Sequence, residues 1–285
     1  MTRFNIQIFL HDKHGKRIDS ESWLKDRLTL FETYTLPSVI GQTCQDFMWI
    51  LLVDSNTPDV YREKIKRYRK CCPQIHFISV KEQNGWKFAY IFQQVVWKML
   101  KEKDAKENDL CLTTYFDNDD CLHKDYIRDV QNLILHNDSK VTSEGGFLTY
   151  DYGMQYYTEL GIATRIKYAN NHFLTLCEKV SFASPSVRTC YGYGSHYDLE
   201  KRHAAPVCHI THAEKPMWIE VIHPGNVDND VKMTLDTCFI KDEKLLRTDF
   251  SVDVDIQTGR HLKFFMRYFK QILRRSFNKF FPRKW

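Results

Sequence analysis

Hydrophobic residues in the first half of the chain follow two alternating patterns. Runs that are apolar at every second position or throughout predict strands at residues 4–10, 47–53, 75–80 and 110–116. Helices are predicted between and after these strands, at residues 22–36, 60–70, 86–100 and 124–136. The first helix is expected to stop near Pro37. Strands that alternate with helices favour right-handed β-α-β units, so the pattern predicts the α/β class.

The second strand indicates how the sheet is covered. Residues 47–53 are apolar at every position and end at Asp54, as expected of a parallel strand with helices on both faces. Later in the chain, short strands rich in Tyr, Gly and Thr follow between Gly145 and Lys167. No repeat or linker separates the two halves. We therefore expect a mostly parallel sheet flanked by helices, with a smaller mixed extension.

Composition and charge divide the chain into a body and a tail. Hydrophobic residues at 43% and charged residues at 27% are typical of a globular protein. Neither a secretory signal nor an apolar run of bilayer length is evident, and the nine cysteines are scattered, which favours a reducing cytoplasm. The net charge of +5 hides an asymmetry, because residues 260–285 hold nine Lys or Arg and no acid. We expect a body, 1–259, and a basic tail.

The tail predicts an amphipathic helix from about His261 to Phe281. Its apolar residues are Leu262, Phe265, Phe269, Ile272, Leu273, Phe280 and Phe281, and its bases include Lys263, Arg267, Lys270, Arg274 and Arg275. Such a helix lies among lipid headgroups, so the predicted partner of residues 260–285 is an anionic membrane surface. Large Phe side chains suit lipid better than a nucleic acid, and we expect no nucleic-acid partner. The alternative is a helix docked on the body.

A run of acids follows the fourth strand. Asp117, Asn118, Asp119 and Asp120 stand at its carboxyl end, as Asp54 does on the second strand, and ligands of open α/β sheets bind at that edge. Two carboxylates separated by one residue can converge on Mg²⁺ or Mn²⁺ and leave positions open for diphosphate oxygens. This is the chemistry needed to bind a nucleoside diphosphate sugar. The alternative is that the acids, Asp120 above all, cap the following helix.

Motifs for other kinds of site are absent or incomplete in this sequence. A calcium loop that starts at Asp117 would need Gly and Glu where the chain has Leu122 and Arg128. Cys208, His209 and His212 have no second ligand pair at zinc spacing. The chain also lacks a phosphate-binding Gly-x4-Gly-Lys loop and a Gly-x-Ser-x-Gly elbow, which argues against an ATPase or a serine hydrolase.

Four blocks of sequence carry a resemblance to a known family. They are Trp23-Leu24-Lys25-Asp26-Arg27, the segment from Leu30 to Thr43, the block Thr114 to Asp120, and the block Trp218 to Val227. Together with the strand that ends at Asp54, they resemble family 2 glycosyltransferases of the GT-A fold, and in particular the bacterial family of putative rhamnosyltransferases. One departure is Tyr115, where that family has Arg.

The resemblance implies a GT-A-like, Rossmann-like fold with a nucleotide-binding half, 1–140, and an acceptor-side half, 141–259. It implies that Asp54 contacts the nucleoside. Asp119 would bind the metal directly, and His223 would complete the metal shell. Asp117 would either reach the metal through water or contact the ribose.

Further roles follow from the same resemblance. Asn118 belongs to the nucleotide-sugar site, and Lys87 would face the diphosphate. The transfer would invert the anomeric centre by direct displacement, with a carboxylate as general base. We place that base at Glu178, with Asp151 as the reserve.

The expected function is therefore metal-dependent transfer of a sugar from a nucleotide-sugar donor to a polyprenyl-linked or other glycan acceptor. The tail places this reaction at the inner face of the cytoplasmic membrane, as part of bacterial surface polysaccharide synthesis. The alternative is a non-catalytic module that holds a nucleotide or sugar while the tail tethers it to the membrane.

Overall fold

The structure is a computed structural model of the 285-residue chain. It describes residues 2–4, 20–81, 88–136, 141, 145–183, 187–194, 196–197, 199–203, 205–226 and 230–280. The α-helices are α1 (Ser20–Leu30), α2 (Leu36–Ile40), α3 (Asp59–Arg67), α4 (Phe88–Glu102), α5 (Tyr126–His136), α7 (Leu199–His203), α8 (Lys244–Phe250) and α9 (His261–Phe280). The strands are β1 (Thr2–Phe4), β2 (Trp49–Asp54), β3 (Ile75–Val80), β4 (Leu110–Thr114), β5 (Cys121–Leu122), β6 (Gly146–Tyr150), β7 (Tyr152–Tyr157), β8 (Ile162–Lys167), β9 (Leu174–Lys179), β10 (Val207–Ile210), β11 (Trp218–Ile222) and β12 (Cys238–Ile240).

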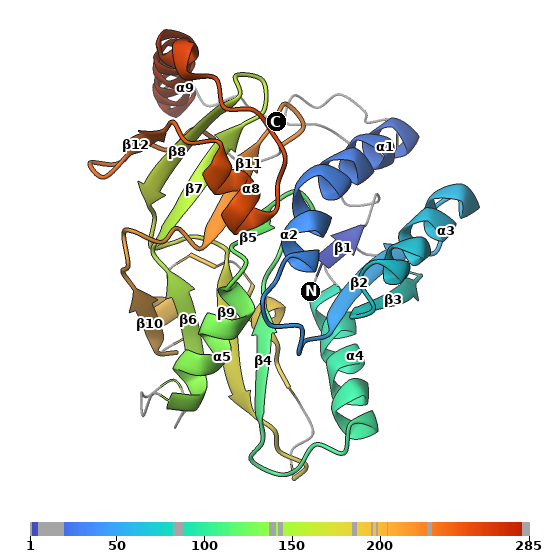
Figure 1. The fold of residues 1–285 in the computed structure, drawn as a ribbon. Helices are drawn as coiled ribbons and strands as arrows, with labels where there is room; N and C mark the ends of the chain where they lie inside the picture. The colour runs from blue at the N-terminus through green and yellow to red at the C-terminus, as the bar shows by residue number, and fades with distance from the viewer. Residues whose placement is uncertain are drawn as a thin grey trace.

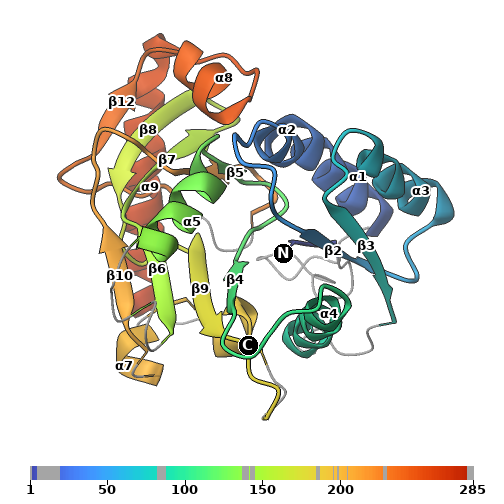
Figure 2. The same ribbon diagram turned by 60° about the horizontal axis from the view of Figure 1, so that its bottom comes forward.

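The N-terminal part is a parallel sheet between two layers of helices. Strands β1, β2 and β3 pair in parallel, with α1, α2 and α3 on one side and α4 on the other (Figures 1 and 2). Alternate residues of β2 enter different cores: Leu51 packs with α1 and α3, whereas Leu52 packs with α4. Because both faces of β2 are buried, the strand must be apolar throughout. The second strand and its flanking helices are confirmed.

The rest of the fold departs from a single parallel sheet. Strand β4 pairs antiparallel with β9, in a sheet of order β10-β6-β9-β4. Strands β5, β7, β8, β11 and β12 form a further mixed sheet of order β12-β8-β7-β11-β5. Part of the reason is local: β7 and β8 form a hairpin, whose turn contains Gly161 with a φ of 62°. The α/β class is confirmed. We expected one mostly parallel sheet, but only β1, β2 and β3 form a parallel sheet among the described residues, and the other two sheets are mixed.

The first helix continues past Pro37, where we expected it to stop. Residues Phe31–Thr35 form a π-helical segment, and the Leu36 N–H donates to the Phe31 carbonyl five residues earlier. Proline lacks an N–H and clashes with the preceding turn of an α-helix. Because Pro37 lies in the first turn of α2, directly after the widened segment, the helical path runs on to Ile40.

Pairing between β5 and β11 places the acid run, which directly precedes β5, beside the mixed sheet that contains β11. Trp218 and Ile219 of β11 lie opposite Leu122 and Cys121 of β5. The Trp218 ring stacks on Phe173 with 4.9 Å between ring centroids. It also lies against Gly153, where a Cβ would be only 2.0 Å from a ring carbon. This close packing fixes β11 beside the segment that leaves β4.

Helix α9 docks on the outer sheet through one of its faces. The buried Phe264 meets Tyr157 and Phe239 edge to face, at 4.9 and 5.2 Å between ring centroids. The Gln271 amide exchanges two hydrogen bonds of 3.0 Å with the Val231 backbone. Tyr157 ends β7 beside the end of β11, so α9 lies near the segment that follows β11.

Candidate functional site

The acid run lies between the end of β4 and the start of β5, where the chain crosses from one sheet to another (Figure 1). Asn118, Asp119 and Asp120 are buried, whereas the Asp117 side chain is 42% exposed. Buried carboxylates need charged or hydrogen-bonding partners. The partners show that the three acids have different roles.

Asp119 is held by residues from two distant segments. Its Oδ2 atom lies 2.5 Å from Arg27 Nη1, on α1, and 2.9 Å from His223 Nε2, just after β11. The Asn226 amide lies 3.4 Å from the same oxygen. Arg27 also donates to Asn118 Oδ1 at 3.3 Å and to the Gly225 carbonyl at 3.5 Å. One guanidinium therefore joins α1, the acid run and the turn at 223–226.

The turn after β11 orients the imidazole of His223. The Gly225 N–H donates to His223 Nδ1 at 3.1 Å, so Nε2 carries the proton that is donated to Asp119. The Asn226 side chain accepts a hydrogen bond of 2.5 Å from the His223 N–H. Sequence analysis placed Asp119 and His223 in one site, and the structure brings them together.

The charge of Asp119 is compensated. Burial raises the pKa of its carboxyl, but the neighbouring Arg27 guanidinium and the His223 hydrogen bond outweigh that effect and hold the pKa well below its usual range. Asp119 is therefore an ionised carboxylate that already forms a buried ion pair.

Asp120 has different partners and is not a helix cap, because α5 begins six residues later, at Tyr126. Its Oδ1 atom accepts the Val221 N–H at 2.9 Å, and its Oδ2 atom lies 2.8 Å from His172 Nε2. Burial, together with the charge of Asp119, raises the pKa of Asp120 to about 7. Burial lowers the pKa of His172, but Asp120 and Asp117 more than offset this effect and raise it to about 9.

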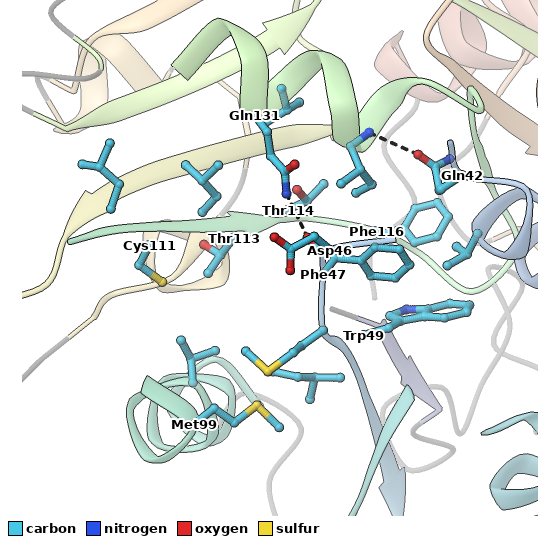
Figure 3. Close-up of a pocket in the computed structure, with 18 of the residues that line it drawn as sticks. Gln42, Asp46, Phe47, Trp49, Met99, Cys111, Thr113, Thr114, Phe116 and Gln131 are labelled. Atoms are coloured by element: carbon cyan, nitrogen blue, oxygen red, sulfur yellow. Dashed lines mark hydrogen bonds between the residues drawn. The ribbon is translucent and has the colours of Figure 1, made fainter. Parts of the chain in front are cut away.

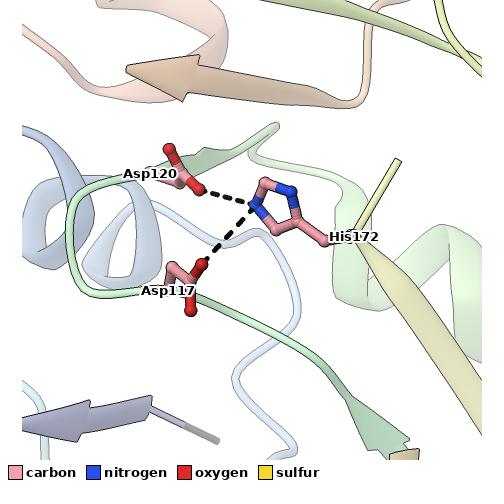
Figure 4. Close-up of side chains that lie close together, drawn as sticks. All are labelled: Asp117, Asp120 and His172. Carbon is pink, nitrogen blue, oxygen red and sulfur yellow. Dashed lines mark hydrogen bonds and ion pairs between the residues drawn. The ribbon is translucent and has the colours of Figure 1, made fainter. Parts of the chain in front are cut away.

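His172 joins Asp117 and Asp120 in a compact group (Figure 4). The two ion-pair distances from His172 Nε2 are 2.8 Å to Asp120 and 3.9 Å to Asp117. One ligand atom from each of the three residues lies within 4.8 Å of the others, as a metal site requires. Sequence analysis missed His172, because it lies in the loop before β9 and outside every recognised motif.

Asp54 is buried at the end of β2. Its Oδ1 atom accepts the Asn56 N–H at 2.8 Å, whereas Oδ2 has no hydrogen-bond partner among the residues that the structure describes. A buried carboxylate oxygen with unused acceptor capacity is costly unless a ligand completes it. Lys87, the expected diphosphate contact, lies outside the described residues.

The two acids suggested as general base do not join this group. Glu178 pairs with Cys111, near the opposite end of β4 from the acid run. Its oxygens accept the Arg188 and Thr189 N–H groups at 2.8 and 2.9 Å. Asp151 precedes β7, the end opposite His223, and lies 2.7 Å from His209 Nδ1. Both carboxylates hold neighbouring segments of the chain.

A separate cavity of about 510 Å³ lies between the start of β2, β4, α4 and α5 (Figure 3). Its walls are mainly apolar, with Met99 and Phe116 among them. Gln131 crosses one side and donates to the Asp46 carbonyl at 2.8 Å. Among the described residues, no acid of the run 117–120 lines this cavity. We therefore treat the cavity as separate from the candidate site, which is the acid run and its partners.

The Arg27–Asp119 pair yields a stability prediction. Replacing Arg27 by Met leaves a buried carboxylate without its cation, so we expect the free energy of unfolding in urea to fall by about 3–5 kcal/mol. Adding Asp119→Asn to Arg27→Met removes the unpaired charge and should recover part of that loss.

The exposed Arg247–Asp253 pair is the matched control. Arg247→Met should change the free energy of unfolding by less than about 0.5 kcal/mol, because exposed ion pairs contribute little. Equal effects of Arg27→Met and Arg247→Met would show that the Arg27 contact does not hold the site together.

Comparison with known proteins identifies the family. A model for the family described as "Putative rhamnosyl transferase" matches residues 2–235. None of the curated proteins matches the chain. The matched region contains α1, the acid run and the turn at 223–226, and it ends before α9. Since the match covers most of the chain, the protein belongs to the putative rhamnosyl transferase family.

Proposed function

We propose that the protein transfers a sugar from a nucleotide-sugar donor to a glycan acceptor hydroxyl, with inversion at the transferred carbon. The family description names glycosyl transfer. The observation that carries the proposal is the acid run itself, in which Asp117, Asp119 and Asp120 meet Arg27 and two imidazoles near the carboxyl end of β4. Such a concentration of charged groups suits a diphosphate leaving group.

The nucleoside end of the donor is assigned to Asp54. Its unpartnered Oδ2 atom, at the carboxyl end of a parallel strand, is a suitable acceptor for a base N–H or a ribose hydroxyl. We assign Asn118 to the donor site because it belongs to the acid run, where its side-chain oxygen accepts a hydrogen bond from Arg27. These two residues would position the nucleotide while the diphosphate points toward Asp117.

The proposed cofactor is Mg²⁺ or Mn²⁺, and Asp117 is the acid of the run that is open to solvent. When bound, the cation would neutralise the negative charge that develops on the departing diphosphate. Asp117 is accessible to such an ion, because 42% of its side chain is exposed. Glu178 and Asp151 are engaged elsewhere, so we assign the general base to neither.

The rival proposal is a non-catalytic module that binds the nucleotide sugar without turnover. Donor binding and donor cleavage separate the two. A donor at 100-fold its dissociation constant should stabilise the protein by about 2.7 kcal/mol in either case, whereas only an enzyme releases the nucleoside diphosphate.

The test is a panel of nucleotide sugars with Mn²⁺, read by melting temperature and by released nucleoside diphosphate. Asp54→Asn should weaken donor binding about tenfold, since it alters one ionic hydrogen bond. Asp117→Asn should lower the rate of release about 100-fold. Asp253→Asn, which alters an exposed ion pair, is the control and should leave both readouts unchanged. Binding without release by the wild-type protein would favour the rival module.

We further propose that α9 places the protein on an anionic membrane surface, at the inner face of the cytoplasmic membrane, where a polyprenyl-linked acceptor would lie. No helix among the described residues is long and apolar enough to span a bilayer. The face of α9 opposite its docked side exposes an apolar stripe at helical spacing, formed by Leu262, Met266, Phe269 and Leu273. The exposed bases Lys263, Lys270 and Arg274 flank this stripe.

This geometry revises the face predicted from sequence. Phe265 packs on Phe239 and Phe264, so it belongs to the docked side. The docked side holds the helix in place, while the stripe and its bases offer apolar area and positive charge to a lipid surface.

Substitution of the stripe tests this membrane contact. Leu262→Ser combined with Phe269→Ser and Leu273→Ser should lower co-sedimentation with vesicles of about 70% phosphatidylcholine and 30% phosphatidylglycerol by about tenfold, because lost apolar area weakens interfacial binding. Val60→Ser with Leu135→Ser, which alters exposed apolar residues on α3 and α5, should have no effect. Undiminished binding of the triple variant would refute the membrane role of α9.

A further inference from the structure

The three acids of the run differ in the ionisable side chains that they contact. Asp119 already has a guanidinium and an imidazole on one oxygen. Asp120 is fully buried, and its only close ionisable partner of opposite sign among the described residues is His172. Buried carboxylates are paired or bind metals. Asp117 and Asp120 instead share one imidazole, whose Nε2 atom on His172 lies 3.9 and 2.8 Å from them.

We propose that the divalent cation of this site is bound by Asp117, Asp120 and His172, and that Asp119 stays outside its coordination shell, paired with Arg27. This inference rests on the proposed function and changes the ligand set expected from sequence, which was Asp117, Asp119 and His223. It assigns a metal-binding role to His172, a residue that no motif identifies.

The distances fit a common ion. Ligand atoms about 2.1 Å from one octahedral cation lie about 3 Å apart when adjacent and about 4 Å apart when opposite. The observed separations from His172 Nε2, 2.8 Å to Asp120 and 3.9 Å to Asp117, match this range. All three ligand atoms lie within 4.8 Å of one another, so an ion can contact them with small side-chain movements.

The surroundings hold two of the ligands in place. The Val221 N–H donates to Asp120 Oδ1 and leaves Oδ2 directed at His172. The His172 ring stacks on Phe173 at 4.2 Å between centroids and meets Tyr115 edge to face at 6.1 Å. Such supporting contacts fix ligand orientation in metal sites. The Tyr115 ring is uncharged, so it adds no positive charge that would repel a cation.

The same contrast argues against the ligand set expected from sequence. His223 Nε2 carries a proton directed at Asp119, because Nδ1 accepts the Gly225 N–H. A metal at Asp119 Oδ2 would have to displace the Arg27 guanidinium as well as that proton, whereas a metal at Asp120 Oδ2 would displace only the proton of His172. Asp117, at 42% side-chain exposure, provides a route for the ion to the other set.

The ligand chemistry selects among cations. Two carboxylates with one imidazole suit Mn²⁺ better than Mg²⁺, which prefers oxygen ligands alone. We therefore expect Mn²⁺ to bind about tenfold more tightly than Mg²⁺.

Binding of Mn²⁺ to the full chain, without nucleotide, tests the proposal. The loss of the free Mn²⁺ signal in electron paramagnetic resonance gives the affinity, and competition gives that of Mg²⁺. His172→Gln and Asp117→Asn should each weaken Mn²⁺ binding about tenfold or more. His223→Gln, which alters the other imidazole next to the acid run, is the matched control and should change the affinity less than about threefold.

Melting curves show whether each variant is folded, and the half-exposed Asp117 provides a variant that leaves the core intact. Loss of Mn²⁺ binding in His223→Gln but not in His172→Gln would overturn the proposal. Wild-type protein that binds no Mn²⁺ would overturn it as well. Donor binding and nucleotide release are measured separately, so failure of this ligand set is distinguishable from failure of the transferase function.

Discussion

The buried ion pair between Arg27 and Asp119 is the contact on which the site depends. It joins α1 to the segment between β4 and β5, and through His223 to the turn after β11. These three segments are far apart in the chain and belong to different layers of the fold. Without this guanidinium, a carboxylate with 4% exposure would have only the His223 and Asn226 hydrogen bonds to compensate for the loss of water. The pair therefore fixes the position of the neighbouring acids.

Neighbouring carboxylates repel one another, and the fold resolves this repulsion by giving each acid a different environment. Asp119 has Arg27 and His223, Asp120 has a backbone N–H and His172, and Asp117 faces solvent. The pKa shifts follow from these environments. The Arg27 guanidinium lowers the pKa of Asp119, whereas burial and the charge of Asp119 raise the pKa of Asp120. One acid thus has a structural role, and the other two are the carboxylates that we propose as ligands of a cation. A diphosphate bound nearby would meet both Arg27 and that cation.

Sequence reasoning found the parts of the site that follow from local position. Asp54 and the acid run follow predicted strands, so the rule for open α/β sheets was enough to select them, whereas His223 came from the family resemblance. Arg27 appeared only as part of a family pattern, because nothing local shows which acid a helix arginine will reach. His172 has no pattern at all. Its role arises from the pairing of β9 with β4, which brings the loop before β9 beside the acid run.

The dependence on contacts between distant segments also explains the errors in the predicted fold. Periodicity located β2, β3, α4 and α5 to within a few residues, because these elements bury a regular apolar face. It could not show that β4 pairs with β9, since strand order depends on long-range contacts. Nor could the sequence show the partners of Glu178, whose oxygens accept two backbone N–H groups of the following loop. Residue type without partners does not separate a catalytic acid from a structural one.

The most direct test is a crystal structure of the protein with Mn²⁺ and a nucleoside diphosphate. Our account predicts anomalous density for Mn²⁺ between Asp117, Asp120 and His172, diphosphate oxygens bound to the ion, and the nucleoside against Asp54. Asp119 should remain paired with Arg27. A diphosphate bound away from the acid run, or one that binds there with no ion at Asp117, would contradict it.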